Sequence, residues 1–259
     1  MPASQATMIY FLMMDEFKKK RILGRKIILD RIIESFRNDD SIAIHQFGSG
    51  TGGFRDEFSD IDIWVTIKDD RIKETVGNLS KIFNGIAPVL VRHHSKSWSP
   101  VGGSASSVIH ENEYGLFVVD YYISKLSETV LKQDAKVVYG VDDLQRGEWK
   151  LNRHVDKKIH DNHTIKKDLD LLIDLVFISI KKIVRNETND GFVVTLRTVH
   201  KNFREKYGKL KPRRISITVR SYLRLLSDFY LISNKRQRRA INKIKKLIRE
   251  VVTVYNIKQ

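Results

Sequence analysis

The chain has 259 residues and a net charge of +16, with 41% hydrophobic and 30% charged residues. This balance is typical of a globular protein and excludes disordered and fibrous classes. The absence of cysteine excludes disulfide scaffolds, zinc–thiolate sites and cysteine nucleophiles. The apolar run from Met8 to Met14 is far shorter than the ~20 residues that span a bilayer, and it lacks the flanks of a signal peptide. We therefore expect a soluble, cytoplasmic protein with no membrane association.

The charge changes sharply along the chain. Residues 1–149 hold 19 basic and 21 acidic side chains, whereas residues 150–259 hold 28 basic and 10 acidic ones. Such a break often follows a domain boundary, so we expect one domain at 1–149 and a basic helical domain at 150–259. The excess positive charge favours a phosphate-bearing partner such as RNA; a helical surface that is merely well solvated is the alternative.

Hydrophobic periodicity predicts the elements in chain order. Apolar residues spaced from Phe17 to Phe36 predict an amphipathic helix over 15–36 whose basic residues face outward. Strands are predicted over 41–47, 60–67, 88–94, 104–110 and 114–123, the second of them by strict alternation. Helical spacing then predicts helices over 166–184, 192–206, 215–232 and 239–255. The expected fold is α+β, with a mixed sheet and helices followed by a C-terminal helical bundle.

The stretch from Phe47 to Val65 carries the most chemical information. A strand leads into a loop with four glycines, and the next strand presents Asp60 and Asp62, which alternation places on one face. Neighbouring carboxylates repel each other unless a cation lies between them, and Mg²⁺ prefers oxygen ligands. Glycines let loop amides approach phosphates closely. The pattern indicates a site for a metal-bound nucleoside triphosphate, and the missing Gly-Lys-Ser/Thr ending excludes a P-loop.

Gly48-Ser49, a spacer of ten residues and Asp60-Ile61-Asp62 together resemble the signature of the DNA polymerase β-like nucleotidyltransferase superfamily. The two-part layout is most similar to that of the nucleotidyltransferases that modify aminoglycoside and lincosamide antibiotics. This resemblance implies a third carboxylate on a later strand. Asp120 matches that place, and it is the only acidic residue inside an apolar strand pattern.

The resemblance also implies a mechanism. Asp60, Asp62 and Asp120 would be the catalytic metal ligands for two Mg²⁺ ions, and Gly48 and Ser49 would bind the phosphates of ATP or another nucleoside triphosphate. Arg55 lies on the same loop and is a candidate phosphate contact; pairing with Asp56 or Glu57 is the alternative. A substrate hydroxyl would attack the α-phosphorus, and pyrophosphate would leave.

Three roles stay open from the sequence. Asp120 is either a metal ligand or the base that accepts the hydroxyl proton. An acidic residue of the helical half is the alternative base, with Asp168, Asp170 and Asp174 as candidates. The polar cluster Arg92-His93-His94 is a candidate for lining the substrate side, and the basic cluster 235–239 is interpreted as a solvated helix entrance.

The acceptor is open as well. Length and layout favour a small molecule with a hydroxyl group, antibiotics included, although the basic second half disfavours a cationic aminoglycoside and favours a neutral or anionic acceptor. Transfer to RNA, such as a tRNA end, or to a protein in a toxin–antitoxin system is the alternative. A non-catalytic binding module is the third reading. Apolar stripes on the helices would support a homodimer.

Overall fold

The structure, a computed structural model, describes residues 5–37, 40–48, 51–52, 56–156, 161, 163–187 and 191–257. The chain divides into two compact units: a sheet unit, Gly24–Asn162, and a helical unit, Met1–Leu23 with His163–Gln259. The units therefore change over at residues 162–163, whereas the expected domain boundary lies at 149–150. Compact packing does not test independent folding, so the two-domain division stays a prediction.

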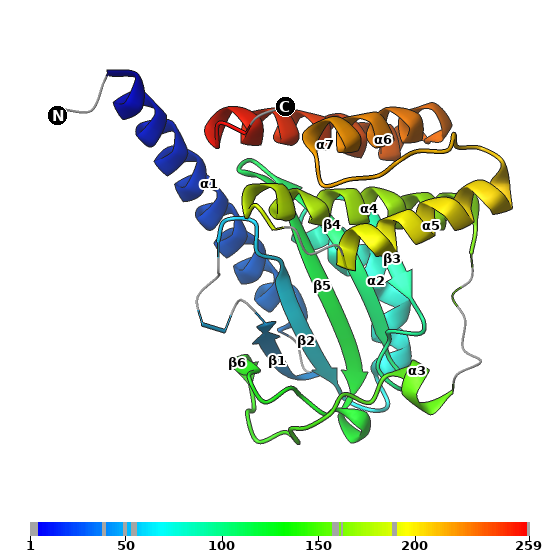
Figure 1. Cartoon of the computed structure of the whole chain (residues 1–259). Helices are drawn as coiled ribbons and strands as arrows, with labels where there is room; N and C mark the ends of the chain where they lie inside the picture. Colours follow the sequence, from blue (N-terminus) through cyan, green and yellow to red (C-terminus); the bar gives the residue numbers. More distant parts are fainter. Residues whose placement is uncertain are drawn as a thin grey trace. The chain divides into compact units, whose positions relative to one another are not determined.

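A mixed sheet of six strands forms the centre of the sheet unit (Figure 1). Its order is β3-β4-β5-β2-β1-β6, with β2 and β5 parallel and the other neighbouring pairs antiparallel. The expected α+β class and mixed sheet are therefore confirmed. The two central strands are the ones that carry the candidate carboxylates. The strands are β1 (Ser41–Phe47), β2 (Ile61–Ile67), β3 (Val89–Ser95), β4 (Ser104–Asn112), β5 (Gly115–Lys125) and β6 (Lys136–Gly140).

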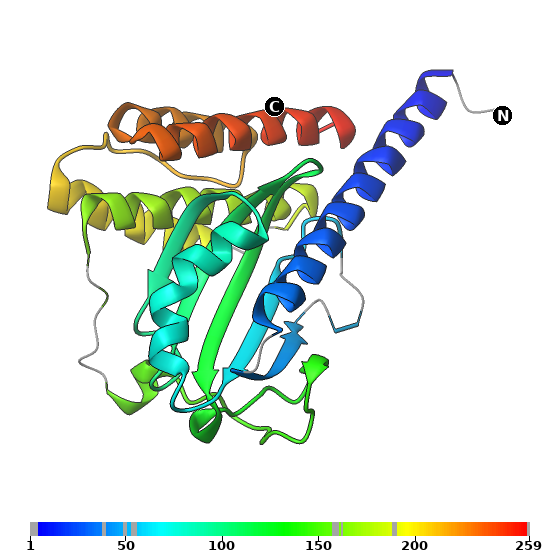
Figure 2. The same ribbon diagram turned by 180° about the vertical axis from the view of Figure 1, so that it is seen from behind.

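One face of this sheet is covered by α2 (Ile72–Ile86) and by the C-terminal part of α1 (Gln5–Phe36), as Figure 2 shows. Alternate residues of β2, Ile63 and Val65 among them, pack there with Ile32 and Phe83 in one buried core. Each such fully buried side chain contributes about 1.5–3 kcal/mol to folding. The periodicity gave no expectation for α2, α3 (Asn152–Val155) or β6.

The expectation that the basic residues of the first helix face outward is wrong for two of them. Arg21 and Arg25 are 4% and 1% exposed, whereas Ile22 and Leu23 are 59% and 44% exposed. Burial lowers the pKa of Arg25 to about 10, although the nearby acidic groups, led by Asp56, oppose this shift. The buried stripe of the helix thus contains two arginines, and Nη2 of Arg25 donates to the backbone carbonyl of Asp56 at 2.9 Å.

Four helices make up most of the helical unit: α4 (Ile165–Val184), α5 (Gly191–Tyr207), α6 (Val219–Ile232) and α7 (Lys235–Val254). They confirm the four predicted helices, and α4 packs against the other three. Thr164, Thr218 and Asn234 cap α4, α6 and α7 by accepting a backbone N–H of the first turn. The cap at Thr218 explains why α6 begins four residues later than predicted. In the described part of the chain, no helix is long and apolar enough to span a membrane.

Candidate active site

Asp62 and Asp120 meet near the centre of the sheet. They are register partners on the parallel strands β2 and β5, so both side chains leave the same face from strands about 4.8 Å apart. Both are partly exposed. The next pair on this face, Trp64 and Tyr122, stacks ring on ring with centroids 5.5 Å apart. Two carboxylates are thus held side by side next to an aromatic surface, on the face opposite the α1–α2 core.

The same row of side chains continues across β4 and β3. Ser107 lies opposite Asp120, and His93 lies opposite Ser107. The Oγ atom of Ser107 is buried and has no hydrogen-bond partner among the described residues. Leaving a buried hydroxyl without a partner costs about 1–3 kcal/mol. Ser107 therefore marks a place beside Asp120 where a bound molecule can supply the missing hydrogen bond.

The polar cluster Arg92-His93-His94 divides between the two faces. Only His93 shares the carboxylate face, because alternation turns its two neighbours away. Arg92 donates to the Oγ of Ser80 on α2 at 2.8 Å and lies 4.9 Å from the ring centroid of Phe83. Burial also lowers the pKa of Arg92. Arg92 therefore belongs to the packing of α2 and does not line the carboxylate face.

Gly48 directly follows β1 and lies close to Asp62. Its φ is +68°, and a Cβ added there would lie 2.7 Å from the Oδ2 of Asp62. The backbone N–H of Gly48 donates to the Oδ2 of Asp134 at 3.2 Å, and the hydroxyl of Thr51 donates to its carbonyl oxygen at 3.0 Å. Only glycine combines this conformation with this close approach. The first residue of the glycine-rich loop therefore leaves space for one of the two carboxylates that a larger residue would fill.

Three other predicted site residues are placed differently. Ser49 and Arg55 lie outside the described residues. Asp60 lies just before β2, which begins at Ile61, and it is not part of the register row that joins Asp62 to Asp120. Its charge acts instead on the buried guanidinium of Arg25, whose pKa it raises against the effect of burial. Arg25 was missed in the sequence; the signal was a basic residue at core spacing, three positions before Ile28.

The carboxylates suit a divalent cation through two ligands. Across the part of the chain that the structure describes, no group of three or more histidine and acidic side chains is arranged as a metal site. Mg²⁺, however, is commonly held by one or two carboxylates together with substrate phosphates and water. Asp62 and Asp120 offer two hard oxygen ligands on one face. This donor set fits a metal that arrives with its nucleotide.

An aromatic cluster lies next to the carboxylates. Phe47, Trp64, Tyr122 and Trp149 pack with ring centroids 4.9–5.6 Å apart, and the ammonium of Lys132 lies 4.3 Å from the ring centroid of Trp149. Burial, with the nearby carboxylates of Asp120 and Asp62, raises the pKa of Tyr122 far above its usual value. The phenol therefore stays protonated and serves as a rigid wall of the site.

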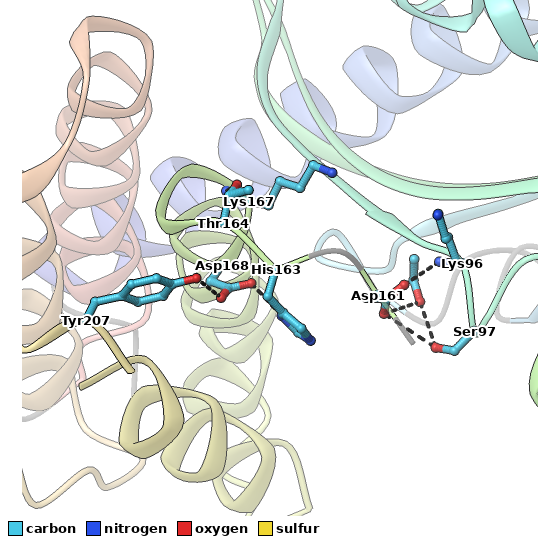
Figure 3. A network of polar contacts seen from close by, with 9 residues as sticks. Lys96, Ser97, Asp161, His163, Thr164, Lys167, Asp168 and Tyr207 are labelled. Atoms are coloured by element: carbon cyan, nitrogen blue, oxygen red, sulfur yellow. Dashed lines mark hydrogen bonds and ion pairs between the residues drawn. The ribbon is translucent and has the colours of Figure 1, made fainter. Parts of the chain in front are cut away.

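The acidic candidates of the helical unit have structural partners. Asp168 accepts hydrogen bonds from the hydroxyl of Tyr207 and from Nδ1 of His163, both at 2.8 Å, as Figure 3 shows. Asp170 is 3% exposed and accepts from Arg236 at 2.6 Å and Gln237 at 3.0 Å. Asp174 is also 3% exposed. Asp168 and Asp170 thus connect α4 to α5 and to α7, and these partners form no catalytic arrangement with them.

A second carboxylate in Figure 3 belongs to the sheet unit. Asp161 accepts from the Oγ of Ser95 at 2.9 Å and from the backbone N–H of Lys96. These bonds tie it to the end of β3. Asp161 therefore fixes a turn at the edge of the sheet.

Comparisons with known proteins identify no family. No protein-family model matches the sequence, and no curated protein has a matching sequence. One similar solved structure is the STING-associated CdnE c-di-GMP synthase from Capnocytophaga granulosa, with 11% identity and a TM-score of 0.31 over 95% of this chain and 84% of that chain. A TM-score this low does not establish a common fold.

Proposed function

We propose that this protein is a Mg²⁺-dependent nucleotidyltransferase that moves a nucleoside monophosphate from a nucleoside triphosphate to an acceptor hydroxyl. The observation that carries the proposal is the register pair of Asp62 and Asp120, with Gly48 so near Asp62 that a Cβ at Gly48 would clash with its carboxylate. Side-by-side carboxylates repel each other in the free protein. A divalent cation removes that repulsion, so the pair is suited to bind Mg²⁺ that arrives together with the polyphosphate of a nucleotide.

Each predicted residue then has a role. Asp62 and Asp120 would hold the metal, and Asp60, which directly precedes β2, would be a further ligand once the nucleotide is bound. Gly48 and Ser49, at the start of the glycine-rich loop, would present amide and hydroxyl groups to the phosphates, and Arg55 would offset their charge. The bound Mg²⁺, as a pair of ions, would neutralise charge on the phosphates and on the entering and leaving oxygens.

The transfer itself is a substitution at the α-phosphorus. The acceptor hydroxyl oxygen forms a bond to the α-phosphorus, and the bond from that phosphorus to the bridging oxygen of the β-phosphate breaks. The hydroxyl proton passes to a carboxylate, for which Asp120 is the candidate, and pyrophosphate leaves. Ser107 and His93 lie in line with Asp120 on β4 and β3. They are placed to contact the acceptor or the nucleotide sugar.

The acceptor we favour is a small molecule, with ATP as the nucleotide. A neutral or anionic hydroxyl compound, a lincosamide-like antibiotic included, suits a chain with a net charge of +16 better than a cationic one. Transfer to RNA or to a protein is the second candidate, and the basic residues of 150–259 are the feature that favours RNA.

A labelling experiment tests this function. The purified protein is given each α-labelled nucleoside triphosphate with Mg²⁺, in separate reactions without acceptor, with antibiotics, with bulk tRNA and with cell protein. Label should enter one acceptor pool. It should fall roughly 100-fold or more in Asp62→Asn and in Asp120→Asn, because several kcal/mol of charge stabilisation is lost.

A matched carboxylate provides the control. Asp143 is exposed and lies outside the carboxylate row, so Asp143→Asn should transfer label as the unmodified protein does. Transfer that persists in both Asp62→Asn and Asp120→Asn would overturn the proposed site. Absence of transfer together with absence of Mg²⁺-dependent nucleotide binding would favour the non-catalytic module.

A further inference from the structure

The helical unit contains a concentrated stretch of positive charge around the connection between α5 and α6. Residues 206–227 include seven basic side chains and no acidic one. Residues 208–218 form neither helix nor strand, and Figure 1 shows them as the long connection from α5 to α6. This stretch lies outside the sheet unit that carries Asp62 and Asp120. It was not singled out from the sequence, where only the cluster at 235–239 was noted.

Three adjoining cavities follow this connection. Their volumes are about 480, 320 and 420 Å³. Arg213 lines all three, Arg220 and Arg224 line the first two, and Arg214 lines the second and third. Shared lining residues make them one continuous surface feature. We call it the basic groove, and its cations are Arg197, Lys201, Arg204, Arg213, Arg214, Arg220 and Arg224.

Acidic neighbours neutralise only part of this charge: the nitrogens of Lys201 and Arg204 lie 4.0 and 3.8 Å from the Oε1 of Glu205. Arg213 forms a two-point ion pair with Asp228, at 2.7 and 2.9 Å. Arg214, Arg220 and Arg224 are exposed and have no acidic partner in the described part of the chain. Unpaired cations that gather around one concave surface repel each other. Their arrangement is favourable only when an anion lies among them.

A buried histidine adds an independent sign of a ligand. His200, on α5, is 4% exposed and lines the third cavity. Its Nε2 atom has no hydrogen-bond partner among the residues described. Burial and the charge of Arg204 both lower the pKa of His200, so the ring is neutral near pH 7. A neutral imidazole nitrogen that is buried at a cavity wall can donate to a bound phosphate if it carries the proton, or accept from a water on that phosphate if it does not.

We propose that the basic groove binds a nucleic-acid duplex through its phosphate backbone. A guanidinium group can donate two parallel hydrogen bonds to one phosphate. Three linked cavities, each lined by cations, suit several successive phosphates better than one small anion. Apart from His200, the three linings contain no aromatic side chain. Single strands are usually held by stacking on aromatic rings. The groove therefore fits a duplex whose bases stay paired.

Fluorescence anisotropy tests this binding on the full-length protein. Labelled RNA and DNA duplexes of about 20 base pairs, and a single strand of equal length, are titrated at about 50 and about 200 mM salt. Arg220→Gln/Arg224→Gln should weaken duplex binding roughly 10-fold and lower the slope of log Kd against log salt by about 2, because two phosphate contacts are lost. The two duplexes show whether RNA or DNA is the ligand.

A pair of lysines on α7 is the matched control for the arginine pair. Lys235 and Lys246 lie exposed on α7, outside the groove, and have no acidic partner among the described residues. Lys235→Gln/Lys246→Gln removes the same charge and should change Kd by less than about threefold if contacts, not net charge, decide binding. Equal losses in the two double variants would overturn the proposal.

Two further measurements test whether misfolding or a small-anion site explains the result. Arg214 lies on the connection and not on α6. Arg214→Gln should therefore weaken duplex binding without changing α6, which separates loss of a contact from misfolding of that helix. Complete release of the duplex by millimolar-range pyrophosphate would mean a small-anion site and would count against the proposal, as would tighter binding of the single strand. The readout is binding, so a failure of the proposed transferase activity leaves this test intact.

Discussion

Asp62 on β2 and Asp120 on β5 occupy the same register position of two adjacent parallel strands. Neither residue is near the other in sequence, and the pairing arises because β5 returns to lie beside β2 inside the sheet. Like charges directly across a strand pair destabilise a sheet by about 0.2–1 kcal/mol. The sheet thus brings two like charges to one register position, which is typical of a site that is completed by a ligand.

Asp120→Asn should therefore stabilise the free protein while abolishing transfer. In a chelator, we expect its free energy of unfolding to rise by roughly 0.5 kcal/mol, because the repulsion with Asp62 is removed. Addition of Mg²⁺ with a nucleoside triphosphate should stabilise the unmodified protein and not the variant. Urea unfolding with and without these ligands measures both effects.

A double-mutant cycle gives the control. If repulsion between the two carboxylates is the cause, Asp62→Asn and Asp120→Asn should each stabilise, and the double variant should gain less than the sum of the two. Strict additivity of the unfolding free energies would show that the two side chains do not interact.

Gly48→Ala should damage the site. An alanine at φ +68° costs about 1–2 kcal/mol, and its Cβ would lie 2.7 Å from the Oδ2 of Asp62, which forces the carboxylate or the loop to move. We expect a loss of about 1–2 kcal/mol in stability and a larger proportional loss in transfer rate, measured by urea unfolding and by the labelling assay.

Gly52 offers the matched comparison on the same loop. A Cβ added at Gly52 meets no atom within 4 Å, so Gly52→Ala should change stability by less than about 0.5 kcal/mol. If both alanine variants behave alike, the loop is tolerant in general and the contact between Gly48 and Asp62 has no special importance.

Local pattern was sufficient for most elements of this fold. Strict alternation located β2, and helical spacing located α4 to α7 to within a few residues, because one face of each is buried. Local pattern did not predict that Asp62 and Asp120 are neighbours, because the register between strands that are distant in sequence is a tertiary property. Ser107 was missed for the same reason: a serine in a strand becomes informative only once its partner across the sheet is known.

Polarity misled the sequence interpretation where charged groups are buried. Arg25 looked like a surface residue of an amphipathic helix, yet it is 1% exposed. Asp170 looked like a solvated or catalytic acid, yet it accepts hydrogen bonds from Arg236 and Gln237 inside the helical unit. Composition cannot reveal such pairs, because each partner comes from a separate element and only packing brings them together.

Ser124→Ala should destabilise the wall behind the carboxylates. The indole N–H of Trp64 donates to the Oγ of Ser124 at 2.7 Å, and that hydroxyl lies 2.6 Å from the Oγ1 of Thr129. Trp64 and Ser124 are 1% and 0% exposed, so no bulk water can replace the lost acceptor. We expect a loss of about 1–3 kcal/mol in the free energy of unfolding.

Ser124→Cys separates the hydrogen bond from the packing. The thiol fills the space of the hydroxyl but accepts hydrogen bonds only weakly, so its stability should lie between those of the unmodified protein and Ser124→Ala. Full stability of Ser124→Ala would mean that the indole N–H finds another acceptor and that the chain of hydroxyls is not important.

Acid should destabilise the sheet unit through His110. Its Nδ1–H donates to the carbonyl of Ala87 at 3.1 Å, and the hydroxyl of Tyr121 donates to its Nε2 at 2.9 Å. Burial lowers the pKa of His110 to about 4 from 6.5. Between these two values the unfolded chain binds a proton that the folded chain does not, so stability falls as the pH drops from about 6.5 to about 4. The difference corresponds to on the order of 3 kcal/mol over that range.

His110→Gln cannot titrate and should be less stable at pH 7, because it loses part of this hydrogen bonding, but its stability should depend less on pH between 4 and 6.5. Urea unfolding of both proteins at several pH values measures the difference, and parallel curves would show that His110 is already charged in the folded protein.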